Sequence, residues 1–201
     1  MLAAVILAAG ESRRMGFPKA LLPYRSGTFL EHLIGITEHA RIGARRVVVG
    51  AHEEEIGRSV TLPSGDWVVN REWSKGQLSS IRAAIESLSG VETEGILLVL
   101  VDHPLVTKRV VGTMLEAFDR LPGSIVIPTW QGRRGHPVIL PTRLFPELRR
   151  ASDEVGARAV VWAHADEVAE VPTEEEGVVL DIDDRATFER LFPSSSEPLV
   201  H

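Results

Sequence analysis

Short apolar runs alternate with amphipathic stretches along the chain. The apolar runs are short and mostly rich in β-branched residues, which predicts β-strands. They lie at residues 5–8, 46–50, 67–69, 96–101, 124–128, 138–140, 167–171 and 178–184. The intervening stretches predict helices, most of them from apolar residues at helical spacing, over residues 28–41, 53–59, 77–88, 109–121, 141–150, 154–164 and 185–191. Strands that alternate with helices form a mostly parallel sheet with helices on its faces. We therefore expect one α/β domain over residues 1–192, a three-layer α/β/α fold with a Rossmann-like sheet, and a flexible tail at 193–201.

Two predicted strands end in polar residues. The most apolar run, 96–101 (ILLVLV), predicts a central strand buried on both faces, and it stops at Asp102. The first strand runs into a turn of small residues that ends at Gly10. Ligands of open α/β sheets bind outside the carboxyl ends of the strands. We expect the two strand ends to flank one crevice.

The turn after the first strand is followed by cations. Small residues let backbone N–H groups approach a ligand, and Arg13, Arg14 and Lys19 suit a polyphosphate. A surface loop with solvated basic residues is the alternative. The stretch is neither a Walker A loop nor a dinucleotide fingerprint, since Ser12 stands where the second glycine of the fingerprint would be.

Carboxylates follow two of the predicted strands. Asp102 follows one, and Asp181, Asp183 and Asp184 lie at the end of another. Two carboxylates suffice to hold Mg²⁺, which keeps waters and takes other ligands from substrate phosphates. The alternatives are a turn residue before proline for Asp102 and a helix N-cap for Asp183 or Asp184, with Asp184 the better cap candidate. The histidine spacing does not predict a zinc site.

Composition narrows the classes of protein to which the chain can belong. The chain has 201 residues, a formal net charge of -6 and no cysteine. A negative net charge argues against a nucleic-acid partner. The absence of cysteines excludes disulfides, thiolate metal ligands and a cysteine nucleophile. The apolar N-terminus lacks the basic region of a signal peptide, and no run is long enough to span a membrane. We expect a soluble, cytoplasmic protein.

The first motif resembles the signature of the MobA-like nucleotidyltransferases, L-A-A-G-x-S-x-R-M-G-x-x-K-x-L-L. The matching positions are Leu7, Ala8, Ala9, Gly10, Ser12, Arg14, Met15, Gly16, Lys19, Leu21 and Leu22. The resemblance implies the nucleotide-diphospho-sugar transferase type of fold. Asp102-His103-Pro104 and Asp181-Ile182-Asp183 are similar to two acidic motifs of the family, whose acids hold Mg²⁺. We expect Asp102 and Asp183 as metal ligands, with Asp181 as the next candidate.

Two further segments resemble the branch that acts on molybdenum cofactor. Residues 70–80 are similar to N-x-x-W-x-x-G-x-x-x-S, which implies that Gly76, Ser79 and Ser80 lie near the nucleotide base. Residues 132–138 are similar to G-x-R-G-H-P-V on the acceptor side. The acceptor-side residues implied are Arg134, Gly135 and His136, with His103 nearby.

The resemblance implies a reaction. A terminal phosphate of molybdopterin would attack the α-phosphorus of a nucleoside triphosphate, release pyrophosphate and give a product for a molybdoenzyme. Arg14, Lys19 and Asp102 would be catalytic, and the nucleotide would contact the signature residues from Leu7 to Lys19, while Arg13 faces solvent. Ala9 and Pro18 are typical of the cytidylyl branch, so CTP is favoured over GTP.

Two other functions remain open. A related transferase could act on a sugar phosphate or another phosphorylated small molecule, because fold alone does not decide function. A non-catalytic carrier of the cofactor could dispense with the three acids, yet all three are present. An oxidoreductase would need the dinucleotide fingerprint, which is missing, so this function is not expected.

Overall fold

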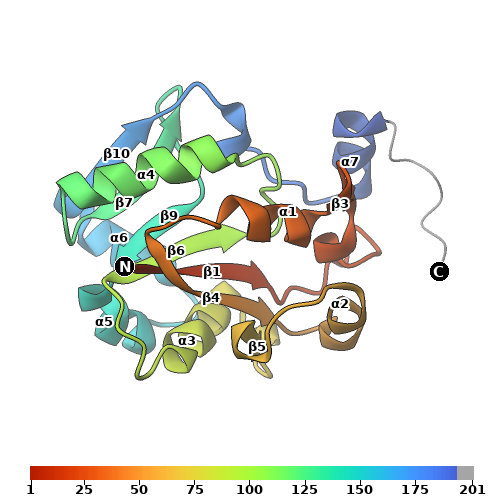
Figure 1. Cartoon of the computed structure of the whole chain (residues 1–201), viewed down its shortest axis with the longest axis horizontal. Coiled ribbons are helices and arrows are strands. Elements are labelled where there is room, and N and C mark those ends of the chain that lie inside the picture. Colours follow the sequence, from red (N-terminus) through yellow and green to blue (C-terminus); the bar gives the residue numbers. More distant parts are fainter. Residues whose placement is uncertain (194–201) are drawn as a thin grey trace.

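A central sheet organises the computed structural model, which describes residues 1–193 (Figure 1). Its strands are β1 (Leu2–Ala8), β4 (Ile42–Val49), β5 (Trp67–Val69), β6 (Gly95–Leu100), β7 (Ile125–Trp130), β8 (Arg133–Arg134), β9 (Val138–Pro141) and β10 (Val168–Pro172). The order is β10-β7-β9-β6-β1-β4-β5, with β8 paired to β7. β9 runs antiparallel to β6 and β7, whereas β1, β4, β5 and β6 are parallel. The predicted mostly parallel sheet is confirmed.

Helices cover both faces of this sheet. They are α1 (Phe29–Ile36), α2 (Glu53–Ser59), α3 (Gln77–Ser87), α4 (Lys108–Arg120), α5 (Phe145–Arg150), α6 (Ala157–Ala163) and α7 (Arg185–Leu191). α1 and α4 lie above the sheet in Figure 1, and α3 and α5 lie below it. Successive side chains of a strand point to opposite faces, so Ile6 of β1 joins the core under α1 and α4 while Val5 joins the core over α3 and α5. These two cores make the three layers that the pattern predicted.

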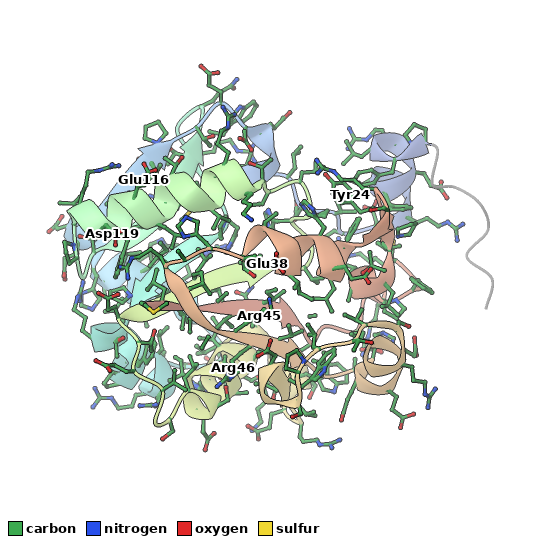
Figure 2. All side chains as sticks on the ribbon, in the orientation of Figure 1. Tyr24, Glu38, Arg45, Arg46, Glu116 and Asp119 are labelled. Carbon is green, nitrogen blue, oxygen red and sulfur yellow. The ribbon has the colours of Figure 1, made fainter. Side chains whose placement is uncertain are left out.

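A third, smaller core joins the signature loop to the C-terminal helix. Met15, Leu22, Phe29, Ile182 and Phe188 pack together in it. The short hairpin of β2 (Pro23–Tyr24) and β3 (Gly27–Thr28) lies beside α7, and Figure 2 shows Tyr24 there. This core holds the chain after residue 180 against the loop that follows β1.

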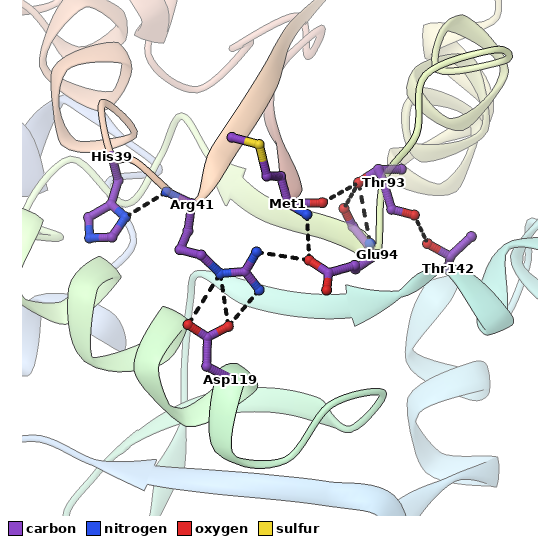
Figure 3. A network of polar contacts seen from close by, with 8 residues as sticks. Met1, His39, Arg41, Thr93, Glu94, Asp119 and Thr142 are labelled. Carbon is purple, nitrogen blue, oxygen red and sulfur yellow. Dashed lines mark hydrogen bonds and ion pairs between the residues drawn. The ribbon is translucent and has the colours of Figure 1, made fainter.

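A network of ion pairs lies at the amino ends of the central strands, at the start of β1. The amino group of Met1 bonds Glu94 at 2.5 Å, and Arg41 bonds both Glu94 at 2.9 Å and Asp119 of α4 at 2.8 Å (Figure 3). The network ties α4 to the starts of β1, β4 and β6. It lies at the other ends of these strands from the cleft described below.

Several predicted elements differ from the structure. Residues 178–184 are not a strand, because Gly177 approaches Leu105 closely and the backbone of Ile182 bonds a loop instead of a sheet partner. The first helix ends at Ile36, not near residue 41. The helix predicted over 141–150 begins as a 3-10 turn, and the one predicted over 154–164 begins after Gly156, whose φ is 73°. The predicted tail lies, beyond Pro193, outside the described residues.

No helix within residues 1–193 has the length and apolar character needed to cross a membrane.

Candidate active site

The site lies where β1 and β6 end side by side. Leu7 of β1 pairs with Leu100 of β6, and the Val101 N–H donates to the Leu7 carbonyl at 3.1 Å. Parallel register therefore brings the small-residue turn of the signature next to Asp102. The crevice predicted between the two strand ends is present.

A cleft of about 340 Å³ opens at these strand ends. The predicted site residues that line it are Leu7, Ala8, Ala9, Gly10, Ser12, Arg14, Lys19, Gly76, Ser80, Asp102 and Asp183. The structure thus brings together four segments that are far apart in the sequence. The volume of the cleft lies at the lower end of the range for small-molecule sites, about 300–1,000 Å³.

The cleft has further lining residues, and of these sequence reasoning missed His52. His52, Trp73 and Gln77 line it. His52 Nε2 lies 2.9 Å from the Glu11 carbonyl, which can only accept, so this nitrogen carries the hydrogen and holds the signature loop. The available signal was position, because His52 follows the end of β4, the neighbour of β1.

The signature loop is tightly wound. Ser12 has a φ of 54°, a left-handed conformation that is uncommon outside glycine, and Gly16 has a φ of 71°. The Ser12 carbonyl accepts from the N–H groups of Met15 and Gly16, and its hydroxyl accepts from the Lys19 N–H at 3.2 Å. These bonds aim Lys19 into the cleft. Arg13 instead pairs with Glu11, and its side chain is 80% exposed at the rim.

Lys19 lies between two carboxylates. Its Nζ is 2.7 Å from Asp183 Oδ1 and 3.8 Å from Asp102 Oδ2. Arg14 Nη2 reaches the other oxygen of Asp183 at 2.5 Å. The hydrogen bond from Lys19, helped by Arg14, lowers the pKa of Asp183, which is therefore ionised at neutral pH.

Main-chain bonding and apolar burial bring Asp183 to this position. The Ile182 N–H donates to the Asp102 carbonyl at 2.8 Å, and the Ile182 side chain is fully buried in the third core. Asp184 takes the capping role, since its carboxylate accepts from the Thr187 N–H at 2.8 Å and starts α7. The N-cap reading therefore holds for Asp184, and Asp183 is left to face the cleft.

The donor set fits a divalent cation. Asp102 and Asp183 both reach the same cationic nitrogen, and Asp102 Oδ1 is buried without a hydrogen-bond partner. Oxygen ligands suit Mg²⁺ or Mn²⁺. In residues 1–193 no group of three or more histidine, aspartate or glutamate side chains could hold a metal alone, so substrate and water would supply the remaining ligands. Asp181 is exposed and does not line the cleft.

The segment before α3 supports the cleft from the β5 side. Asn70 is buried and bonds the hydroxyls of both Ser79 and Ser80. Ser80 lines the cleft, whereas Ser79 bonds the carbonyls of Glu72 and Gly76 and does not. In this geometry Ser79 shapes the loop and Ser80 faces a ligand.

The predicted acceptor residues lie beyond Asp102, and none lines the cleft. The rings of His103 and His136 are 5.0 Å apart, and the Nδ1 atom of each is buried without a partner. Burial lowers the pKa of His103, and burial together with His103 lowers the pKa of His136 to about 3, so both are neutral at pH 7. Arg134 is exposed and pairs with Glu170 at 2.8 Å, away from the two histidines.

Gly135 has a packing role. A Cβ at Gly135 would lie 2.1 Å from the Val178 carbonyl oxygen, and the next residue, His136, donates its N–H to that oxygen at 2.7 Å. The segment 176–184 thus runs against residues 135–136 before it reaches the cleft.

Comparison with known proteins yields one family. Residues 4–168 match the model of the MobA-like NTP transferase domain. Nicotine blue oxidoreductase of Paenarthrobacter nicotinovorans is 33% identical over 166 residues, which span 77% of this chain and 78% of that protein. A probable molybdenum cofactor guanylyltransferase of Bacillus mycoides is 25% identical over 132 residues, 66% of this chain and 64% of that protein.

Solved structures agree with this fold. Rv0371c from Mycobacterium tuberculosis H37Rv superposes with a TM-score of 0.81 at 26% identity, over 96% of this chain and 97% of that one. A complex of Rv0371c with manganese superposes with a TM-score of 0.75, over 96% and 98%.

Proposed function

The chain belongs to the MobA-like NTP transferase family, and from this premise we propose that it is a magnesium-dependent cytidylyltransferase acting on molybdopterin. The enzyme transfers CMP from CTP to the terminal phosphate of the pterin and releases pyrophosphate. One observation carries the proposal. Lys19, Asp102 and Asp183 come from three distant segments and meet in one cleft beside the small-residue turn of the signature.

Binding of the triphosphate uses the signature loop. Backbone groups of Ala8, Ala9 and Gly10 meet the nucleoside, because their small side chains leave room for close approach. Arg14 contacts phosphate oxygens as a planar fork of donors, and Lys19 acts as a point charge. Both cations now bond Asp183, so they are already held in the cleft before substrate arrives.

The chemical step needs little proton transfer. An oxygen of the acceptor phosphate attacks the α-phosphorus, the bond from the α-phosphorus to the bridging oxygen breaks, and that oxygen leaves with pyrophosphate. The acceptor phosphate is largely ionised at pH 7, since its second pKa is about 6, so no general base is required. Arg14 and Lys19 stabilise the negative charge that grows on the leaving group. A divalent cation held by Asp102 and Asp183 would supply further charge neutralisation.

Residue identity supports the choice of CTP and of the acceptor. Ala9 and Pro18 match the cytidylyl branch, and the segment 132–138 matches the acceptor motif of the enzymes that act on molybdenum cofactor. His103, which follows Asp102 in the chain, and His136, whose ring lies 5.0 Å from the His103 ring, are both neutral and are proposed to bond the acceptor. The product would pass to a molybdoenzyme. We place both proteins in the cytoplasm, a reducing compartment with which a chain without cysteines is compatible.

The test is pyrophosphate release with Mg²⁺ and intact molybdenum cofactor, with CTP, GTP, ATP and UTP compared. Asp102→Asn is the test variant. Asp184→Asn is its matched control, because asparagine also caps helices and Asp184 does not line the cleft. The proposal predicts release with CTP that needs the cofactor, fails in the first variant and persists in the second. Release with GTP instead would overturn the choice of base, and release only with a sugar phosphate would overturn the acceptor.

A second candidate is a redox function, favoured by the 33% identity to an oxidoreductase over 77% of the chain. The missing dinucleotide fingerprint does not decide between nucleotidyl transfer and a redox function, because a protein named as an oxidoreductase matches 77% of this chain. Oxidation of NADH or NADPH by the purified protein, in the absence of any nucleotidyl transfer, would favour it.

A further inference from the structure

A buried amide controls one wall of the cleft. Asn70 is 4% exposed and lies at the end of β5, next to the first turn of α3. Its Nδ2 donates to Ser79 Oγ at 2.8 Å and to Ser80 Oγ at 3.0 Å. Its Oδ1 accepts from the Glu72 N–H at 2.9 Å. Three of its hydrogen-bonding positions are therefore used within the protein.

The backbone fixes which way round this amide lies. An N–H group can only donate, so the atom that faces the Glu72 N–H must be the amide oxygen. The opposite orientation would set two donors against each other in a buried place, which is costly. Nδ2 consequently faces both serines, and both serine hydroxyls must accept from it.

The two hydroxyls then differ in where their hydrogens point. Ser79 Oγ donates to the Gly76 carbonyl at 2.7 Å, with the Glu72 carbonyl at 3.0 Å as the other acceptor. Ser80 Oγ has Asn70 as its partner, and within the described chain no acceptor is recorded for its hydrogen. Because Ser80 lines the cleft, this hydrogen is available to a ligand.

Charge indicates which part of a nucleotide lies there. The cationic side chains of the cleft, Arg13, Arg14 and Lys19, come from the signature loop. The start of α3 contributes only uncharged groups, those of Gly76, Gln77 and Ser80. The phosphates belong beside the cations, so the uncharged base belongs beside α3.

We propose that Asn70 is a positioning residue that makes the Ser80 hydroxyl a hydrogen-bond donor to the base. The inference rests on the proposed function, since it assumes a nucleotide in the cleft. The group recognised is an acceptor atom of the base, such as the O2 carbonyl or N3 of cytosine.

The sharpest test reverses this polarity without changing shape. In Asn70→Asp the carboxylate can only accept, so it still bonds the Glu72 N–H but draws the hydrogens of both serines toward itself. At pH 8 a carboxylate that accepts three hydrogen bonds is ionised. Ser80 then offers the base only lone pairs, and its hydrogen is no longer available.

The measurement is titration calorimetry of CTP with Mg²⁺ and no acceptor. Ser80→Ala should weaken CTP binding about tenfold, the size of one lost hydrogen bond. Asn70→Asp should weaken it at least as much, and should cause no further loss when Ser80 is already alanine. Ser87→Ala is the matched control on the same helix, and it should bind CTP within about twofold of the wild type because its hydroxyl bonds the Ala84 carbonyl outside the cleft.

Three results would overturn the inference. They are an unchanged affinity in Ser80→Ala, an unchanged affinity in Asn70→Asp, and an Asn70→Asp effect that persists in full without the Ser80 hydroxyl. Ser80→Ala and Ser87→Ala keep the test valid if Asn70→Asp fails to fold. Wild-type protein that binds no nucleotide would refute the proposed function itself, an outcome distinct from nucleotide binding that ignores Ser80.

Discussion

Ile182 links the stability of the third core to the geometry of the cleft. Its side chain is fully buried beside Met15, Leu22, Phe29 and Phe188, and the next residue is Asp183. Ile182→Ala removes three carbon atoms, which at about 0.8 kcal/mol each is a transfer loss of about 2.4 kcal/mol. The cavity left behind adds to this, so we expect unfolding free energy to fall by about 3–4 kcal/mol.

Urea denaturation followed by circular dichroism measures this loss. Ile182→Val should cost about 1 kcal/mol, and Val155→Ala, at an exposed position, should cost under about 0.5 kcal/mol. Nucleotidyl transfer by Ile182→Ala should drop by more than its folded fraction explains, because Asp183 loses its support. A loss below about 1 kcal/mol for Ile182→Ala would refute the view that this core holds the C-terminal segment in place.

Three other variants test separate parts of the account. Lys19→Met should lower transfer at least about 100-fold and should reduce stability at neutral pH. This stability difference should begin to shrink as pH falls below the usual aspartate value of 3.8, and it should vanish once pH is below the lowered pKa of Asp183, because Lys19 stabilises only the ionised carboxylate. His164→Gln should be less stable than wild type at pH 6 but not at alkaline pH. Hydrogen bonds to two glutamates raise the pKa of His164, and the stability that these bonds contribute is lost as pH rises through that pKa. Denaturation at several pH values measures the difference. Gly135→Ala should cost at least about 2 kcal/mol by thermal unfolding, because its Cβ would meet the Val178 carbonyl oxygen at 2.1 Å, whereas Gly112→Ala in open space on α4 should be neutral or stabilising.

Local pattern was sufficient for the strand ends of the cleft. The runs before Gly10 and Asp102 are short, apolar and followed at once by polar or small residues, so their type could be predicted, and the residue at which each strand ends could be predicted to within one position. The start of β1 at Leu2, three residues before the predicted start, was not predicted. The parallel pairing of β1 with β6 then follows from the alternation of strands and helices. The direction of β9 could not be predicted, because a short apolar run is the same pattern in either direction.

Other features depend on contacts between distant segments. Asp183 was predicted as the end of a strand, yet it is held by one main-chain bond to Asp102 and by burial of Ile182. His52 carries no spacing that marks it, and the fold alone brings it to the cleft. The resemblance named Asn70 only as part of a motif, because its bonds to two serines exist only once β5 and α3 are packed together.

The most direct test of the central claim is the affinity for CTP with and without Mg²⁺ in wild type, Asp183→Asn and Asp184→Asn. The account predicts that Mg²⁺ strengthens CTP binding at least about tenfold in wild type and in Asp184→Asn, and that this gain is lost in Asp183→Asn. Equal gains from Mg²⁺ in all three proteins would contradict a metal site at Asp183. No gain in any of them would contradict a metal-dependent nucleotide site in this cleft.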